Sequence, residues 1–112
     1  MSDDINIFRC LDFIRDTSSK YAKAKAERIY LEEFRKSKKS LLMRDAEIAG
    51  HKSAATQERE AYAHEEYVQL LEALRSAVES EETLRWQITA ASAKIEVWRS
   101  LSANERMEKK VL

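Results

Sequence analysis

Residues that make turns are almost absent from this sequence, and their absence constrains the fold more than any other feature. The 112 residues include no proline and a single glycine, Gly50. Sheets, barrels and sandwiches need frequent turns, which glycine and proline largely supply. Charged residues instead make up 36% of the chain, and Ala, Glu, Lys, Leu and Arg fall at helical spacing, which is typical of long helices and coiled coils. We therefore predict one all-α domain over residues 1–112.

The spacing of apolar residues and of capping residues predicts three helices. The first spans about residues 3–15 and follows an N-cap supplied by residues 2–4 (SDD). The second spans about residues 18–49 and the third about residues 53–107. Between the first two, residues 16–19 (DTSS) predict either a break or a kink in one longer helix.

The predicted turn between the long helices is Gly50–Lys52. A glycine just past a helix end adopts left-handed backbone at little cost, and Ser53 is suited to cap the helix that follows. The alternative is a glycine inside one continuous helix, which costs only about 1 kcal/mol.

Folding the chain back at Gly50 matches residues at equal distances from it, such as Leu31 with Leu70 and Leu42 with Glu58. The second helix is then shorter than the third, and the first helix continues its line opposite the rest of the third. The predicted fold is therefore all-α: an elongated antiparallel helical hairpin with one short N-terminal helix and two long helices.

A regular heptad begins at Tyr67 and predicts the seam of a coiled coil. Its large apolar members are Tyr67, Leu70, Leu74, Leu84, Ile88, Ile95 and Trp98. Glu81 is the one charged residue at a heptad position. Because a lone hairpin leaves the outer half of each apolar stripe in water, we expect a homo-oligomer, with a dimer favoured, as a coiled coil or bundle.

A basic segment covers residues 20–44, with nine basic and three acidic residues, although the formal net charge of the chain is zero. Five of its cations fall on one arc at 100° per residue, roughly opposite an apolar arc. These cations are Lys25, Arg28, Arg35, Lys36 and Lys39. The opposite arc holds Ala24, Tyr30, Leu31, Phe34, Leu41, Leu42 and Ile48. The cations predict either a solvated or partner-facing surface or, less favoured, one that contacts nucleic-acid phosphates.

An acidic row follows in the third helix and predicts a surface for a protein partner. Its residues, with the arginine and tryptophan beside them, are Glu65, Glu66, Glu72, Glu79, Glu82, Arg85 and Trp86. A regular row of carboxylates can occupy a basic groove on another protein and exclude nucleic acid from it, and Trp86 could anchor the contact. The simpler alternative is that exposed glutamates favour the helix and keep it in solution.

The sequence carries no arrangement of residues typical of an enzyme, a metal site or a cofactor site. Cys10 is the only cysteine, and we expect it to be a small buried side chain. His51 and His64 are thirteen positions apart, without a second ligand at helical spacing. No glycine-rich phosphate loop, signal peptide or apolar run of membrane-spanning length is present. These features predict a non-enzymatic protein of a reducing cytoplasm, with no membrane partner.

Two blocks resemble small helical proteins of tailed bacteriophages and prophages. They are AKAERIYLEEFRKSKKSLLM (24–43) and AASAKIEVWRSLSANERMEK (90–109). Proteins of this kind are commonly encoded near phage recombination and single-strand-binding genes, so the resemblance implies the cytoplasm of a bacterial host.

Two functions remain open with this setting. The first is binding and blocking of a bacterial protein, such as a nuclease or a CRISPR-type defence complex, through the acidic row and Trp86. The second is an accessory role in phage recombination or replication, with DNA bound by the basic arc. A structural coiled coil that only bridges other phage proteins is not separable from the first.

Overall fold

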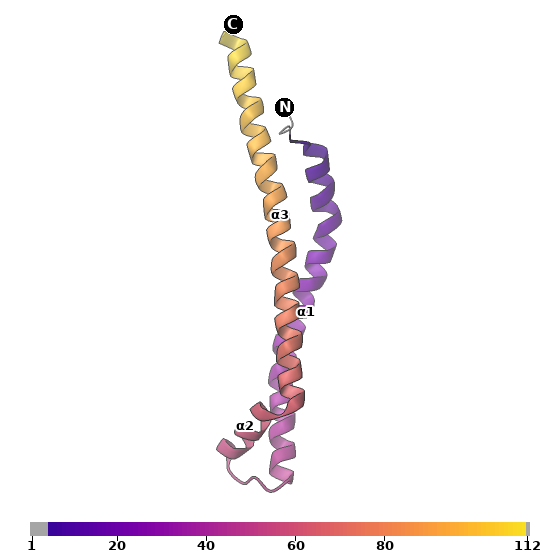
Figure 1. The fold of residues 1–112 in the computed structure, drawn as a ribbon, viewed down its shortest axis with the longest axis vertical. Helices are drawn as coiled ribbons and strands as arrows, with labels where there is room; N and C mark the ends of the chain where they lie inside the picture. The colour runs from indigo at the N-terminus through magenta and orange to yellow at the C-terminus, as the bar shows by residue number, and fades with distance from the viewer. Residues whose placement is uncertain (1–4, 112) are drawn as a thin grey trace. The chain divides into compact units, whose positions relative to one another are not determined.

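The computed structural model describes residues 5–111 and, within that range, contains three α-helices and no strand (Figure 1). They are α1 (Ile7–Ile48), α2 (Ala54–Ala63) and α3 (Glu65–Val111). The predicted all-α class is therefore confirmed. No helix in the described range is long and apolar enough to cross a membrane.

The helices are divided between two units. Unit 1 combines residues up to Ala22 with Glu82 and the residues after it, and unit 2 is Lys23–Glu81. Both long helices contribute to both units, so each unit pairs a piece of α1 with a piece of α3. The prediction of a single domain stays a prediction.

Of the two alternatives predicted at residues 16–19, the structure has the single longer helix: α1 is continuous from Ile7 to Ile48, so the predicted helices 3–15 and 18–49 are parts of one element. The polar residues 16–19 do not break it. Thr17 is buried, and the hydroxyl of Ser18 donates to the carbonyl of Ile14 within the helix, so this hydroxyl does not cap a new one. The N-cap of α1 is Asn6, whose side-chain oxygen accepts from the Arg9 amide at 3.1 Å. The cap predicted at residues 2–4 lies outside the described residues.

The chain turns after Ile48 as the single glycine predicts. Gly50 has a φ of 109°. Its amide donates to the Glu47 carbonyl and the next amide, of His51, donates to the Ala46 carbonyl, both at 3.0 Å. This pair of bonds closes the helix end as a Schellman motif, which needs left-handed backbone at the glycine. Ser53 then caps α2 by accepting from the Thr56 amide at 3.1 Å.

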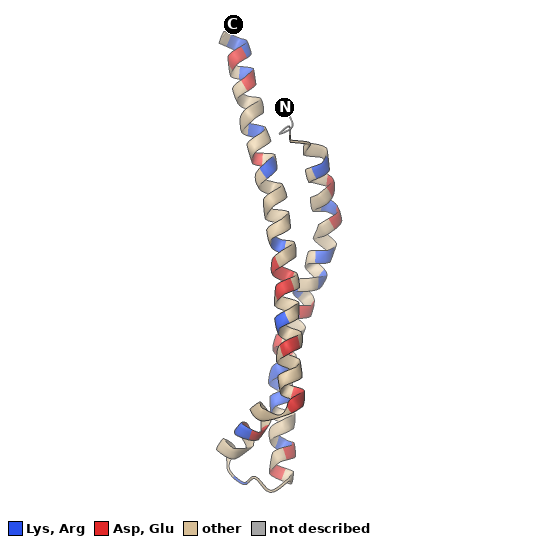
Figure 2. Ribbon diagram, in the orientation of Figure 1, with Lys and Arg blue, Asp and Glu red and all other residues tan. Residues whose placement is uncertain are grey.

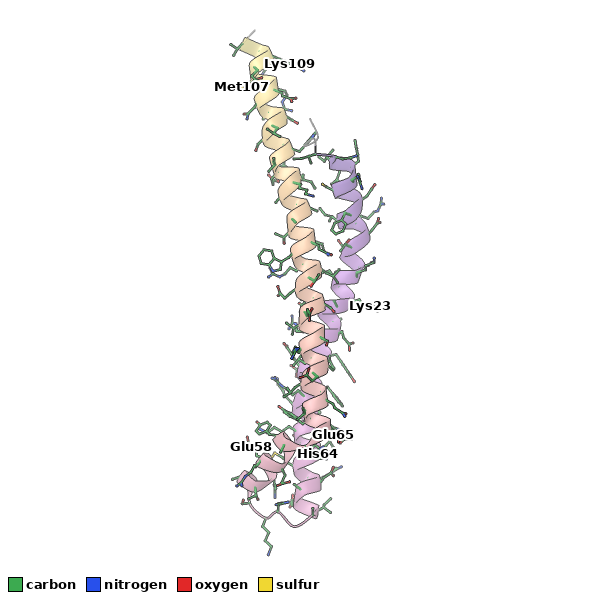
Figure 3. All side chains as sticks on the ribbon, in the orientation of Figure 1. Lys23, Glu58, His64, Glu65, Met107 and Lys109 are labelled. Carbon is green, nitrogen blue, oxygen red and sulfur yellow. The ribbon has the colours of Figure 1, made fainter. Side chains whose placement is uncertain are left out.

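The predicted continuous helix 53–107 is also wrong, because His64 separates α2 from α3. His64 has extended backbone, with ψ of 137°, and its ring nitrogen Nδ1 accepts from the Glu66 amide at 3.1 Å. The imidazole therefore caps α3, a role usually filled by a short polar side chain. Figure 3 labels His64 and Glu65 at this corner, where α2 is set at an angle to α3.

The bend at His64 builds the apolar core of unit 2. Ala61, on α2, is fully buried and packs with Leu42 of α1 and Tyr67 of α3, and Met43 lies against this cluster. The rings of Tyr62 and Tyr67 meet edge to face across the corner, with centroids 5.3 Å apart. A straight helix could not place these residues together, so burial of Ala61 and Tyr67 stabilises the bend.

Candidate functional site

Arg28 and Glu81 form a partly buried ion pair that joins α1 to α3 inside unit 2. The guanidinium donates to both carboxylate oxygens, with 2.9 Å between Nη2 and Oε1, and a third bond of 3.0 Å goes to Glu32. Only 6% of Glu81 is exposed. The Glu81 hydrogen bonds raise the pKa of Arg28 above its ordinary value, with Glu32 adding to the effect. A fork of this kind fixes position as well as charge.

This pair explains the charged residue in the α3 heptad. Glu81 occupies an inward position, and a cation from α1 meets it there. The sequence carried this signal, since a lone carboxylate on a coiled-coil seam needs a buried partner. The prediction that Arg28 lies on a basic arc facing away from the neighbouring helix is therefore wrong. Arg28 lies on the side of α1 that meets α3.

A second polar cluster joins α1 to α2. The Lys39 ammonium is 3.1 Å from a Glu58 carboxylate oxygen and 4.7 Å from the centre of the Tyr62 ring. Two contacts raise the pKa of Lys39: the one with Tyr62 has the larger effect and the one with Glu58 the smaller. Hydrogen bonds from Lys39, with the larger effect, and from Tyr62 lower the pKa of Glu58. Figure 3 labels Glu58 on α2. Folding the chain back at Gly50 predicted that Glu58 would lie near Leu42, but its carboxylate contacts Lys39.

The five cations of the predicted nucleic-acid arc do not form one open surface. Lys25 and Lys36 are exposed, and Lys36 contacts Glu33 at 3.3 Å. Arg28, Arg35 and Lys39 are half-buried, and two of the three are engaged by Glu81, Glu32 and Glu58. Figure 2 shows acidic and basic residues interleaved along the helices of unit 2. This interleaving lowers the positive potential available to a phosphate backbone.

The acidic row is likewise divided. Glu66 pairs with Lys38 of α1 at 3.1 Å inside unit 2. Glu72 pairs with Arg75 at 3.7 Å, and the Glu65 carboxylate accepts from the side-chain amide of Gln69 at 3.2 Å. Glu79 is exposed. In unit 1, Glu82 accepts two hydrogen bonds from Arg85, the shorter of 2.6 Å. One of these carboxylates, Glu66, therefore binds a cation of the neighbouring helix.

Trp86 lies exposed on α3 in unit 1, and its ring is covered on one side by the Arg85 guanidinium at 4.5 Å. It begins a row of exposed apolar side chains at spacings of four, seven, eleven and fifteen residues, which fall within an arc of about 80° at 100° per residue. The row, called the Trp86 stripe below, is Trp86, Ala90, Ala93, Val97 and Leu101. Trp86, Val97 and Leu101 are 58%, 51% and 53% exposed.

The predicted seam of α3 faces inward over most of its length. Tyr67 and Leu74 are buried, and Leu70, Leu84, Ile88 and Ile95 are half-buried. Trp98, expected in the core, is instead exposed. The seam and the Trp86 stripe lie on nearly opposite sides of α3. Within the described residues, α3 therefore carries an exposed apolar row in addition to its seam.

The seam of α1 differs from the predicted apolar arc. Its seam in unit 2 is a row of buried and half-buried residues that alternate by four and three positions: Ala24, Arg28, Leu31, Arg35, Lys38 and Leu42. Glu32, Lys39 and Met43, which are half-buried, and Ala46, which is buried, lie beside this row. The remaining large members of the predicted arc are exposed: Tyr30, Phe34, Leu41 and Ile48. The helix carries two stripes, and only the one with basic residues matches Glu81 and Glu66 of α3.

No metal site emerges in the part of the chain that the structure describes. No group of three His, Cys, Asp or Glu side chains is placed to hold a metal ion within residues 5–111. Cys10 is buried in unit 1, as expected for a small apolar side chain.

Comparison of the chain with protein-family models, with curated proteins and with solved structures finds no match. The resemblance of residues 24–43 and 90–109 to phage proteins therefore stays a prediction.

Proposed function

We propose that this chain is a non-enzymatic interaction protein that binds another protein through the Trp86 stripe of α3. The supporting observation is a row of five exposed apolar or small residues on the side of the helix away from its buried seam. A tryptophan with an arginine packed on its ring is the kind of residue pair that dominates binding energy at protein interfaces.

The chemistry of this stripe favours an amphipathic helix or an apolar groove as the partner. Spacing of four, seven, eleven and fifteen residues is that of one helix laid along another or into a groove. The resemblance to phage proteins adds a source for the partner: a bacterial protein, such as a nuclease or defence complex, that binding would block.

The DNA-binding alternative has less support. Binding to DNA strengthens with each phosphate that a cation neutralises. Of the five candidate cations, Arg28 and Lys39 are engaged by carboxylates of other helices, and Lys36 has one beside it.

Affinity capture from a bacterial lysate with the wild-type chain and two single variants tests this proposal. Trp86→Ala removes the anchor of the stripe, and Trp98→Ala is its matched control, since Trp98 is also exposed and lies about 120° away around the same helix. We expect the captured protein to be lost with Trp86→Ala and retained with Trp98→Ala. Equal capture by all three chains would overturn the proposal.

A second arm separates the two functions. The purified chain is mixed with labelled single- and double-stranded DNA at low salt and at about 0.2 M salt. We expect no binding at either concentration. Salt-sensitive binding that is lost in a Lys25→Glu, Lys36→Glu double variant would instead favour the DNA-binding function.

A further inference from the structure

A second apolar stripe on α1, separate from the Trp86 stripe, remains uncovered in unit 2. Tyr30, Phe34, Leu41 and Ile48 fall within an arc of about 40° at 100° per residue. This row is called the Phe34 stripe below. Its side chains are 61%, 37%, 43% and 78% exposed, in that order, and the Tyr30 and Phe34 rings stack at 5.9 Å. The stripe lies about 100° around the helix from the seam that meets α3.

The exposed surface of the whole chain is larger than that expected of a compact protein of the same mass, which leaves ample area for a partner. The chain exposes 8711 Å², whereas a folded monomer of 13.0 kDa exposes about 6300 Å². The excess, about 2400 Å², is roughly three times the area that one partner contributes to a standard protein interface. No large side chain is fully buried in the described chain, so the core of one copy is thin.

We propose that the Phe34 stripe binds the same stripe of a second copy, with the two α1 helices antiparallel. A thin core has to be supplemented whenever the chain is folded, and a second copy is the one partner always present with it. In a two-fold arrangement each residue pair occurs twice. If Phe34 lies opposite Leu41 of the second copy, Leu41 of the first copy also lies opposite Phe34 of the second. The two stripes then contact each other at two apolar positions.

Charges beside the stripe favour the antiparallel orientation. Glu33 and Arg44 lie on the same edge, the one away from the α3 seam. With Phe34 opposite Leu41 of the second copy, Glu33 falls two residues, or about 3 Å, from the level of Arg44 of that copy. Arg44 has no ion pair within residues 5–111, and the Glu33 contact with Lys36 is solvent-exposed.

A parallel pair would offer a different contact. It would set Glu33 beside Lys38 of the second copy, but Lys38 is held by Glu66 of its own chain at 3.1 Å. The free partner for Glu33 is therefore Arg44, which only the antiparallel orientation brings close.

Sedimentation equilibrium of the full chain tests which face associates. We expect the wild type to have twice the 13.0 kDa chain mass, and Leu41→Asp to raise the dimer dissociation constant by about 100-fold or more, because it buries a carboxylate in an apolar contact. Ile29→Asp is the matched control. Ile29 is 43% exposed, as Leu41 is, but lies about 115° from the stripe. A monomeric wild type, or equal dissociation constants for Leu41→Asp and wild type, would overturn the proposal.

Charge reversal tests the orientation and does not depend on a variant that might unfold. Glu33→Arg and Arg44→Glu should each weaken the dimer by about tenfold, while the double variant Glu33→Arg, Arg44→Glu should restore it. Failure of the double variant to recover, or no effect of Arg44→Glu, would overturn the antiparallel pairing. Trp86→Ala should leave the dimer mass unchanged, so a failure here is distinguishable from a failure of the proposed partner surface.

Discussion

Unit 1 and unit 2 are built from the same two helices, yet different contacts hold them. In unit 2, Arg28 with Glu81, Lys38 with Glu66 and Lys39 with Glu58 join different helices. The Leu42, Ala61 and Tyr67 cluster adds an apolar centre. Among the described residues of unit 1, the buried side chains are Cys10, Thr17 and Ala91, all of them small. Its ion pairs of Arg15 with Asp12, Arg85 with Glu82 and Arg99 with Glu96 each lie within one helix.

This difference separates two ways of pairing helices. Small buried residues allow close approach but tolerate sliding, because one small residue replaces another at little cost. A forked ion pair at a seam position tolerates no slip, since a shift of one residue would bury both charges without partners. We infer that unit 2 sets the register of α1 against α3, and that unit 1 is the less stable part, where binding energy from a partner has the larger effect.

The largest expected effect comes from truncating the cores of the two units. Leu42→Ala in unit 2 should lower the free energy of unfolding by about 2–4 kcal/mol, because it removes a buried side chain from the Ala61 and Tyr67 cluster. Ile95→Ala in unit 1, at a half-buried position, should cost about 1 kcal/mol. Urea unfolding followed by circular dichroism, at one protein concentration for all variants, measures both. Equal losses would contradict a more stable unit 2.

Reversing the Arg28 and Glu81 charges tests what sets the register. Arg28→Glu and Glu81→Arg should each destabilise the chain clearly, because the first sets a carboxylate beside Glu81 and Glu32 and the second sets two guanidinium groups together at a partly buried site. The double variant should recover much of the loss, and a double-mutant cycle gives the coupling energy. The matched pair in unit 1 is Arg99 with Glu96, where the same reversals should change little, since both side chains are exposed. Absence of recovery in the Arg28 and Glu81 double variant would contradict the register role.

The sequence predicted α3 better than α1, for a physical reason. The α3 seam follows a regular heptad with larger apolar residues than the Trp86 stripe holds over most of its length, so Tyr67, Leu74 and Ile88 could be assigned inward from spacing alone. In α1, two stripes compete. The more apolar one, with Tyr30 and Phe34, was expected inside, but the stripe with Arg28 and Arg35 faces α3. Choosing between them requires knowing that Glu81 occupies an inward position opposite.

The bend at His64 had no local signal of the usual kind. Neither glycine nor proline marks it, and helix-forming residues surround it. It forms because packing of Ala61 with Leu42 and Tyr67 outweighs local preference, a gain that appears only once α1 lies alongside. Gly50 and Ser53, by contrast, act through their own backbone and hydroxyl, and both were predicted correctly.

A smaller effect is expected at the turn that enters α2. Gly50→Ala should lower the free energy of unfolding by about 1–2 kcal/mol. The space around Gly50 is open, so the cost comes from its φ of 109° and not from a clash. Lys52→Ala, two residues along the same turn, is the control and should be neutral. Thermal unfolding of both variants gives the comparison, and equal transition temperatures would show that the Schellman motif does not depend on glycine here.

The smallest expected effect is the pH dependence that the Lys39 and Glu58 pair gives to unit 2. The folded pKa of Glu58 is lowered by Lys39 and Tyr62. The pair therefore stabilises the folded chain fully at pH values above the unfolded pKa of Glu58, about 4.3. This contribution is lost as pH falls through the folded-state pKa of Glu58. The folded pKa of Lys39 is raised, so its contribution is present below an unfolded pKa of about 10.4 and is lost as pH rises through the folded value. Between these limits the pair contributes a constant amount.

Replacing the carboxylate isolates the acid side of this dependence. Glu58→Gln should reduce the fall in urea midpoint between about pH 6 and pH 2.5, because the variant has no proton to take up at this position. Glu96→Gln is the control in unit 1, where the exposed carboxylate lies 3.4 Å from the exposed Arg99, three residues along its own helix, and it should change the slope less than Glu58→Gln does. If both variants reduced the fall in urea midpoint equally, the loss of stability in acid would come from both units. The ion pair between α1 and α2 in unit 2 would then have no special role in acid.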